Sequence, residues 1–421
     1  MNEKNNKFDI AVIGAGPAGM MAAIKASESG ARVVVLEKNK KPGVKLLLTG
    51  NGICNLTNAR IKPTHLKPFY GKKSGFLFHS FNVFGPEKTM EFFESRGLKL
   101  KRERGDRIFP VTDKASSVLS VLLKELKKNG VVLICKAKVH RFKKEGKKIK
   151  GVILYDKSEI LADDFIICSG GKAYPSTGSD GSGFRWATSL SHTVTKAYPV
   201  LTPLNVKEEW VRELEGLSLK NVEFIIKSKK KFKALGECVF TRHGVSGPLA
   251  LSASEKIVEI LEKENVKISL NLKPGLDRSK LDKRIRRDFE KYSNKAFKNG
   301  LRDLIPSKMI PVIVKLSGVD PEKEVNKITK EKRKAIVELL KDLELTITGT
   351  AGFDMAITNS GGVSLSEIDE RTMRSKLMDN LFFAGDILDI HGPTGGFNLQ
   401  ICWSTGYLAG KNAAKKEYDK A

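Results

Sequence analysis

The stretch FDIAVIGAGPAGMMAAIKASESGARVVVLEK, residues 8–38, decides the fold of this chain. Its first residues predict a short buried strand, GAGPAG predicts a tight turn, and the residues that follow predict a helix that ends at Gly30. The second apolar run, RVVVLE, predicts another strand, and its unbroken hydrophobicity suits a parallel sheet that is covered on both faces. Residues 8–37 therefore predict one βαβ unit.

The glycines of this unit have the GxGxxG spacing in the context that dinucleotide binding requires. They follow a strand, they open a helix, and an acid, Glu37, ends the next strand. Gly14 would allow the tight turn, Gly16 would let the backbone approach a pyrophosphate, and Gly19 would let the helix pack closely on the strand. The N–H groups at the helix start would bind the diphosphate, and Glu37 would bind the adenosine ribose.

Three features outside this unit favour FAD over NAD as the dinucleotide. Lys38 and Lys45 are placed for the ribose or the diphosphate, and TGNGICN (49–55) offers a close backbone approach to a flat ring. DNLFFAGD predicts a strand that delivers Asp386 to a ribityl chain, although helix capping is an alternative role for this residue. GPTGGFN (392–398) precedes the C-terminal helix, whose first N–H groups would face the pyrimidine side of a flavin.

The net charge is the unusual feature of a composition that is otherwise ordinary for a globular protein. The chain is 40% hydrophobic and 29% charged. Its length of 421 residues predicts two to three domains. The 75 Lys and Arg against 48 Asp and Glu give a net charge of +27. We interpret this excess as a solvated, lysine-rich surface, with clusters at 141–150, 227–233 and 278–300. RNA binding or attraction of an anionic substrate is the alternative.

Short apolar runs and scattered cysteines indicate a cytoplasmic enzyme. No apolar run approaches the length that crosses a bilayer, and the first ten residues contain no apolar signal segment. The five cysteines, at 54, 135, 168, 238 and 402, form no CxxC pair. We therefore expect no disulfide framework, no metal site and no membrane partner.

The pattern of predicted secondary structure changes in the middle of the chain. Strand-like pieces predict a β-rich unit between about 200 and 273, and residues 277–343 read mostly as short helices. After these helices, strand-like apolar runs and glycine-rich turns occur again. Because the cofactor motifs occur on both sides of this middle part and none occurs within it, we expect the two ends of the chain to fold together.

Six motifs in order along the chain resemble the BaiN/YhiN-like flavoprotein family, whose members are catalogued as NAD(P)/FAD-dependent oxidoreductases or as aminoacetone oxidase family enzymes. These motifs are GAGPAG, LLLTGNGICNLTN, CSGGKAYPSTGSDGSG, GECVFTRHGVSGP, AITNSGGV and TMRSKLMDNLFFAGDILDIHGPTGGFNLQICWSTG. The resemblance implies an α/β fold of the two-dinucleotide-binding-domain flavoprotein type, with an inserted β-barrel and a small helical domain. The expected boundaries are 1–194 and 346–421 for the two segments of the FAD domain, 195–275 for the barrel and 276–345 for the helices.

The resemblance also carries FAD contacts onto this sequence. It implies Ala15, Glu37, Lys45, residues 49–54, Val139, Gly170, Asp386, Asn398 and Leu399; from the strand pattern alone Val139 would be a core residue. With the glycine motif and the neighbouring turns, the predicted FAD-binding set is Gly14, Ala15, Gly16, Ala18, Gly19, Glu37, Lys38, Lys45, Thr49, Gly50, Asn51, Gly52, Cys54, Val139, Ser169, Gly170, Asp386, Gly396, Phe397, Asn398 and Leu399. Relatives commonly read SGGGRCN where this chain has TGNGICN, so Ile53 replaces their Arg.

Four side chains in Gly/Pro-rich segments are candidates for the chemistry: Tyr174, Arg242, His243 and His391. Plain surface roles are the alternative for each of them. Lys172 and Tyr174 gain some support, because they follow the Ser169-Gly170-Gly171 turn beside the expected cofactor. Cys54 has no partner thiol in its motif, so we expect a structural cysteine rather than a redox disulfide.

Together these features predict an FAD-dependent oxidoreductase. In the mechanism we favour, NAD(P)H gives a hydride to the flavin, and the hydride then goes to a conjugated C=C bond of a small hydrophobic substrate. The resemblance suggests steroid or bile-acid enones. No second nucleotide fingerprint is present, so NAD(P)H would bind transiently in the substrate cleft. The alternatives are amine oxidation with oxygen as acceptor and a basic, RNA-associated flavoprotein with structural FAD. The sequence does not fix the oligomeric state.

Overall fold

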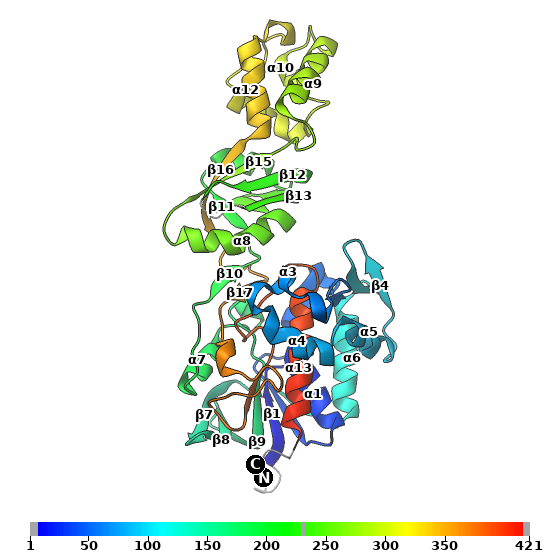
Figure 1. The fold of residues 1–421 in the computed structure, drawn as a ribbon, viewed down its shortest axis with the longest axis vertical. Coiled ribbons are helices and arrows are strands. Elements are labelled where there is room, and N and C mark those ends of the chain that lie inside the picture. The colour runs from blue at the N-terminus through cyan, green and yellow to red at the C-terminus, as the bar shows by residue number, and fades with distance from the viewer. Residues whose placement is uncertain (1–6, 229–231, 416–421) are drawn as a thin grey trace. The chain divides into compact units, whose positions relative to one another are not determined.

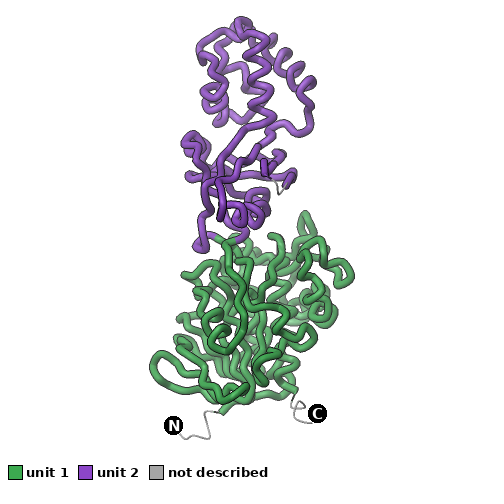
Figure 2. Tube along the Cα trace, turned by 60° about the vertical axis from the view of Figure 1, so that its left-hand side comes forward, with its two compact units in different colours: residues 1–199, 356–421 green, residues 200–355 purple. Residues whose placement is uncertain are grey.

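The computed structural model describes residues 7–228 and 232–415, and the chain divides into two compact units (Figures 1 and 2). Unit 1 contains residues 1–199 and 356–421, and unit 2 contains residues 200–355. Residues 229–231, the centre of one predicted lysine cluster, lie outside the described residues.

Unit 1 is built on a mainly parallel sheet in the order β6-β2-β1-β9-β8-β7, with β18 beside β9. The βαβ unit expected at the start of the chain is present as β1 (Lys7–Ile13), α1 (Pro17–Glu28) and β2 (Val33–Glu37), and the two strands are parallel. All five residues of β2 are buried, as its unbroken apolar run predicts. The remaining strands of this sheet are β6 (Val132–Cys135), β7 (Val139–Glu145), β8 (Lys148–Leu154), β9 (Glu159–Ile167) and β18 (Leu381–Phe383).

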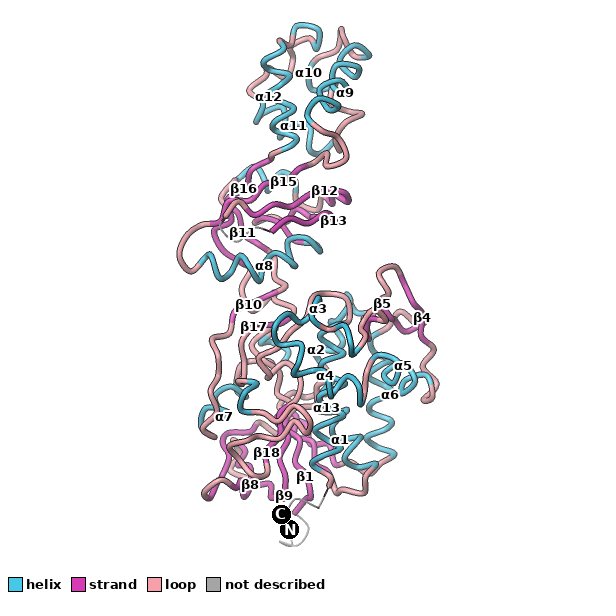
Figure 3. Tube along the Cα trace, in the orientation of Figure 1, coloured by secondary structure: helices cyan, strands magenta, loops and turns pink. Residues whose placement is uncertain are grey.

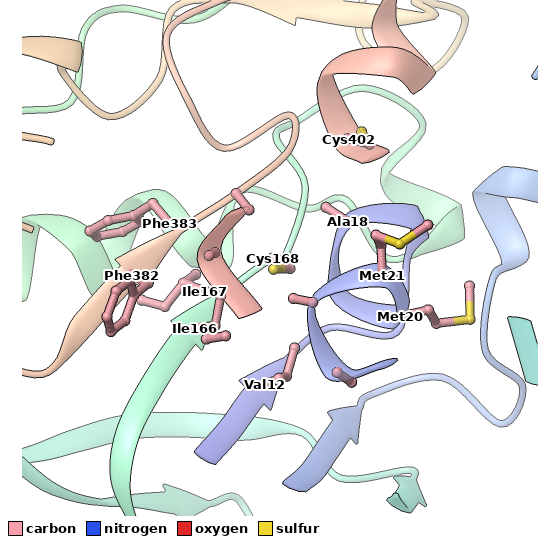
Figure 4. Close-up of a cluster of buried hydrophobic side chains, with 14 of the residues drawn as sticks. Val12, Ala18, Met20, Met21, Ile166, Ile167, Cys168, Phe382, Phe383 and Cys402 are labelled. Carbon is pink, nitrogen blue, oxygen red and sulfur yellow. The ribbon is translucent and has the colours of Figure 1, made fainter. Parts of the chain in front are cut away.

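The helix α13 (Phe397–Ala413) from the second segment packs against α1 from the first. A Cβ on Gly406 would come within 2.3 Å of the Ala18 carbonyl oxygen, and one on Gly410 within 2.1 Å of the Ala22 carbonyl oxygen. These two glycines therefore let the helix backbones approach closely. Figure 4 shows side chains of α1, α13, β1, β9 and β18 in the core beneath this contact.

Further helices and two small sheets complete unit 1 (Figure 3). The helices are α2 (Val44–Leu48), α3 (Lys67–Tyr70), α4 (Ser74–Val83), α5 (Pro86–Glu94), α6 (Ala115–Lys128) and α7 (Ser182–Ser189). A three-stranded sheet contains β3 (Thr57–Asn58), β4 (Leu100–Glu103) and β5 (Arg107–Pro110), and a two-stranded sheet pairs β10 (Tyr198–Val200) with β17 (Thr358–Ser360).

Unit 2 is a closed barrel in the order β11-β14-β13-β12-β15-β16, with helices inserted between its last two strands. The barrel strands are β11 (Leu204–Val206), β12 (Ser218–Ile226), β13 (Phe232–Thr241), β14 (Gly244–Ser246), β15 (Val266–Asn271) and β16 (Leu343–Thr350). The helices are α8 (Gly247–Leu261), α9 (Arg278–Lys291), α10 (Phe297–Gly300), α11 (Ile310–Ser317) and α12 (Lys330–Lys341). One continuous apolar core serves barrel and helices.

The observed division differs from the expected boundaries where the chain leaves the helices. The prediction ended the helical domain at 345 and began the second FAD segment at 346, but β16 crosses that point. It pairs with β15 and with β11, which closes the barrel, so unit 1 resumes only at residue 356. Strand pairing across an insertion of about 70 residues leaves no local signal in the sequence.

Candidate functional site

The three glycines of GAGPAG have three different surroundings in the turn between β1 and α1. Gly14 has φ +104°, and a Cβ there would lie 2.6 Å from the Cys168 carbonyl oxygen. A Cβ on Gly19 would lie 1.9 Å from the Gly14 carbonyl oxygen, whereas one on Gly16 would meet nothing within 4 Å. Gly14 and Gly19 are thus required by the fold itself, and Gly16 leaves space open in front of the helix.

The start of α1 offers that space backbone donors. Gly16 is its N-cap, no side chain caps the helix, and its first turn carries no acidic residue. The first N–H groups of a helix lack intrahelical partners and carry positive partial charge. This end of α1 therefore suits a phosphate group.

Glu37, at the end of β2, is buried and holds the turn. Its Oε2 accepts a hydrogen bond of 2.9 Å from the Ala15 N–H, and its Oε1 accepts one of 2.8 Å from the Asn39 N–H. The sequence motif assigns this acid to a ribose. In the structure it also connects the glycine turn to the loop after β2, a second role that the motif did not indicate.

These elements line a cleft of unit 1 that is partly open to solvent, with about 870 Å³ of empty space in it and at its mouth. Eleven residues of the predicted FAD-binding set line it: Gly14, Ala15, Gly16, Ala18, Glu37, Lys38, Lys45, Val139, Ser169, Gly170 and Asp386. The ten that do not are Gly19, Thr49, Gly50, Asn51, Gly52, Cys54, Gly396, Phe397, Asn398 and Leu399. Gly19 acts through packing, and the other nine belong to the loop 49–55 and to the start of α13, both described below.

Lys45 and Asp386 meet in the cleft although 341 positions separate them. The Lys45 Nζ lies 3.0 Å from the Asp386 Oδ2, and the Cys402 Sγ donates to Oδ1 at 3.6 Å. Burial raises the pKa of the Cys402 thiol, so this thiol is neutral. A cationic and an anionic side chain are therefore available at the wall formed by α2, β18 and α13.

A second ion pair ties two loops together at the cleft. The Lys38 Nζ lies 2.8 Å from the Asp180 Oδ2, and the Asn39 Nδ2 donates to the Thr177 carbonyl at 2.9 Å. Burial alone would raise the pKa of Asp180, but hydrogen bonds from Lys38 and Ser182 outweigh it and lower the pKa to about 2. The carboxylate is therefore charged at neutral pH.

Several cleft residues were missed by the sequence reasoning. They are Ile13, Pro17, Leu36, Asn39, Gly43, Val44, Leu46, Ala137, Lys138, Cys168, Thr177, Gly178, Ser179, Asp180, Ser182, Trp186, Gly385 and Cys402. A signal existed for the run 177–182, because it lies in the motif CSGGKAYPSTGSDGSG. No local signal marks Trp186 or Cys402, whose places depend on how α7 and α13 pack.

The loop 49–55 is held by its backbone conformation and by a buried cysteine. Gly50, Asn51 and Cys54 have φ values of 57°, 55° and 70°, in the left-handed region. Burial raises the pKa of the Cys54 thiol to about 12. A neutral, fully buried thiol agrees with the expected structural cysteine.

The start of α13 contacts the neighbouring loop directly. A Cβ on Gly396 would lie 2.5 Å from the Thr57 carbonyl, and the Asn58 Nδ2 donates to the Gly395 carbonyl at 2.9 Å. The Asn398 side chain accepts from the Gly392 N–H at 2.8 Å and donates to the Gly392 carbonyl at 2.9 Å. A cofactor contact by Asn398 stays a prediction.

None of the four predicted catalytic side chains lines the cleft. Tyr174 and His391 lie in unit 1, each half-buried. Arg242 and His243 are exposed at the turn between β13 and β14 in unit 2. They line a separate hollow of about 550 Å³ with Asn205, Val206, Lys207, Glu208, Glu209 and Arg212. Their part in the chemistry stays a prediction.

Lys172 is placed by a residue from the second segment. Its N–H donates to the Asn359 Oδ1 at 2.9 Å, and the Asn359 Nδ2 donates to the Gly361 carbonyl at 3.0 Å. A Cβ on Gly171 would come within 1.8 Å of the same Oδ1. Buried Asn359, in the motif AITNSGGV, thus fixes the loop after β9 beside the cleft.

Among residues 7–228 and 232–415, no cluster of three or more His, Cys, Asp or Glu is arranged to hold a metal ion. In the same ranges no helix has both the length and the apolar character needed to cross a membrane.

Over residues 8–412 the sequence matches the family described as HI0933-like protein Rossmann domain. The chain belongs to this family. It is 34% identical over 97% of its length to 3-dehydro-bile acid delta(4,6)-reductase of Clostridium scindens, of which it covers 99%. It is 24% identical over 96% of its length to ribosomal RNA dihydrouridine synthase of Escherichia coli, of which it covers 98%.

A solved structure agrees with this assignment at the level of the fold. The 3-ketosteroid-delta4-(5alpha)-dehydrogenase of Rhodococcus jostii matches with a TM-score of 0.54 at 14% identity, covering 98% of each chain. Membership and fold confirm the resemblance and the predicted Rossmann-type flavoprotein fold with an inserted barrel and helices. They support the predicted class, an FAD-dependent oxidoreductase.

Proposed function

We propose that this protein is an FAD-dependent reductase that takes a hydride from NAD(P)H and adds it to a C=C bond conjugated with a carbonyl group. The observation that carries the proposal is the cleft of unit 1. The uncapped start of α1, the open space at Gly16, the carboxylate of Glu37 and the Lys45–Asp386 ion pair all line this one cleft. Such a sequence of donors and acceptors suits a dinucleotide with a polyol arm.

The residues of the cleft would bind and orient the cofactor. Backbone N–H groups at the start of α1 would hold the diphosphate, Glu37 the adenosine ribose, and Asp386 the ribityl chain. When bound, FAD supplies the hydride transfer. Cys54 adds no redox chemistry, because its thiol is buried and neutral.

The likeness to a bile-acid reductase supports a conjugated enone in a hydrophobic, steroid-like substrate. One hydride goes to the carbon remote from the carbonyl, and one proton goes to the neighbouring carbon, which together saturate the double bond. Tyr174, Arg242, His243 and His391 are the candidate side chains for that proton or for orienting the carbonyl. Water is the alternative proton source.

An anaerobic stopped-flow experiment tests the proposal. The purified holoprotein is mixed with NADH or NADPH, then with a 3-keto-delta4 steroid as probe. We expect the flavin absorbance to bleach with one donor and to recover when the steroid is added, with the saturated product found by mass spectrometry. Bleaching by an amine but by neither nicotinamide would contradict the proposal and favour the amine oxidase.

A second candidate function is reduction of uridine in ribosomal RNA. Two observations favour it: the full-length likeness to ribosomal RNA dihydrouridine synthase and the net charge of +27. The chemistry is of the same kind, because the C5=C6 bond of uracil is conjugated with the C4 carbonyl. Incubation of the holoprotein with NAD(P)H and ribosomal RNA, followed by nucleoside mass spectrometry, tests it. Formation of dihydrouridine with no turnover of any enone would establish this candidate over the first.

A further inference from the structure

We propose that the surface formed by β7, β8 and Tyr155, at one edge of the sheet of unit 1 (Figure 1), is a binding surface for single-stranded segments of RNA. It is called the hairpin surface here, and it comprises residues 136–150 and Tyr155. The inference extends the second candidate function above. It needs no catalysis, so each can fail without the other.

Over fifteen residues the hairpin surface is the densest positive stretch of the described chain, and of its cationic residues only Lys138 lines the cleft. Residues 136–150 contain eight Lys and Arg against a single acid, Glu145. All eight side chains are exposed. Lys143 pairs with Glu159 at 3.3 Å and Lys150 with Glu145 at 3.1 Å. The other six form no ion pair with any residue that the structure describes: Lys136, Lys138, Arg141, Lys144, Lys147 and Lys148.

Protection of a sheet edge explains only part of this charge. β7 is the terminal strand of its sheet, and lysines on such strands discourage pairing with other chains. Lys147 lies instead at the hairpin turn, and Lys148, the first residue of β8, pairs with Glu145 of β7, while β8 pairs with β9 from Gly151 to Ile153. Charge at a turn does not block lateral pairing with another strand, so a partner with negative charge is the better account of it.

An exposed aromatic ring, Tyr155, lies beside Lys138 at the end of the hairpin opposite its turn. Tyr155 is 57% exposed, Lys138 Nζ lies 4.5 Å from its ring centroid, and the His140 ring meets it edge-on at 4.8 Å. Backbone phosphates with unstacked bases are the chemistry that combines multiple anionic contacts with an aromatic platform. The lysines would neutralise phosphates without reading sequence, and Tyr155 would stack a base.

A membrane surface fits these residues less well. Peripheral membrane binding commonly uses an amphipathic helix that buries an apolar face, whereas this surface is a two-stranded hairpin. Among the exposed large apolar side chains of this sheet, Leu161, 37% exposed, lies on β9 next to β8, whereas Val132, 42% exposed, lies on β6 at the other end of the strand order. Vesicle binding is therefore treated as an outcome that overturns the inference.

The test uses FAD-loaded full-length protein and a fluorescein-labelled, mixed-sequence single-stranded RNA, without nicotinamide. The variant Arg141→Glu/Lys144→Glu/Lys147→Glu should bind at least about tenfold more weakly than wild type at low salt. The slope of log K against log salt should fall by about 2, since each lost phosphate contact removes about 0.7. The control triple Lys280→Glu/Lys283→Glu/Arg287→Glu on α9 changes net charge equally and should weaken binding less than about twofold.

Two substitutions of Tyr155 separate the contribution of base stacking from that of charge. Tyr155→Ala should weaken RNA binding about tenfold with an unchanged salt slope, and Tyr155→Phe should bind like wild type. FAD content is measured for every variant, because Lys138 and Val139 line the cleft. The inference would be overturned if the two triple variants lost the same RNA affinity, or if the hairpin triple variant bound RNA like wild type. Binding of the protein to phosphatidylserine vesicles but not to RNA would also overturn it.

Discussion

The cleft of unit 1 and the hollow of unit 2 are built in opposite ways. The cleft is formed by a glycine turn, a helix start and a buried acid whose oxygens accept backbone N–H groups. Half of the residues that line the hollow are exposed charged side chains, among them Lys207, Arg212 and Arg242. A site made from backbone depends on the absence of side-chain atoms, whereas a site made from side chains depends on their presence.

This difference sets how each region should respond to mutation. In the cleft, one added carbon atom either fills ligand space or disturbs the fold. In the hollow, removal of one charged group should change ligand affinity and leave fold and cofactor intact. The four predictions below test this contrast, from the largest expected effect to the smallest.

Gly16→Val should abolish FAD binding while the apoprotein still folds. A Cβ at Gly16 meets no protein atom within 4 Å, so its branched side chain would occupy the space proposed for the diphosphate. The flavin content of the purified protein and the melting temperature of the apoprotein measure the two effects.

Gly19→Ala is the matched control for this prediction. Its Cβ would lie 1.9 Å from the Gly14 carbonyl oxygen, so this variant should lose stability even without cofactor. Normal FAD content in Gly16→Val would show that the diphosphate does not lie at the start of α1.

Glu37→Ala should weaken FAD binding by about 1.5–3 kcal/mol, the usual contribution of hydrogen bonds to a charged group. The variant also loses the acceptors of the Ala15 and Asn39 N–H groups, so the melting temperature of the apoprotein should fall. Fluorescence titration of the apoprotein with FAD gives the affinity. Glu37→Gln keeps one carbonyl acceptor, so its FAD affinity should lie between those of wild type and Glu37→Ala. Wild-type affinity in Glu37→Ala would place the ribose elsewhere.

Arg242→Ala should raise KM or lower kcat by about fivefold, the scale of an exposed charge pair, with full FAD content. Arg302→Ala removes another exposed arginine of unit 2 outside the hollow and should leave both constants unchanged. If Arg242→Ala instead lowers the melting temperature with normal kinetics, this arginine serves the barrel and not the substrate.

Acid should remove the contribution of Asp180 to the stability of the apoprotein. The pKa of this carboxyl is about 2 in the folded chain and 3.8 ordinarily. Its contribution is therefore present above about pH 4 and is lost as the pH falls towards 2. The group is partly exposed, so the effect should stay below about 1 kcal/mol. Unfolding curves of wild type and Asp180→Asn should converge over this range, and a constant difference would contradict the assignment.

The sequence by itself determined the βαβ unit and the dinucleotide turn. Both depend on residues close together in the chain: apolar runs form the strands, and glycines allow a backbone that a Cβ would block. Glu37 was predicted for the same reason, because the length of one βαβ unit fixes where its second strand ends. The family resemblance added Val139, a cleft residue that the strand pattern alone assigns to the core.

Only the tertiary structure decided which distant residues share the site. Lys45 meets Asp386, and Asn359 holds the loop at Lys172, across separations of 341 and 187 positions. The closure of the barrel by β16 and the arrival of Cys402 at the cleft also depend on packing. Periodicity and turn chemistry report local backbone preferences, whereas these contacts follow from which elements pack together, and that is set by the core as a whole.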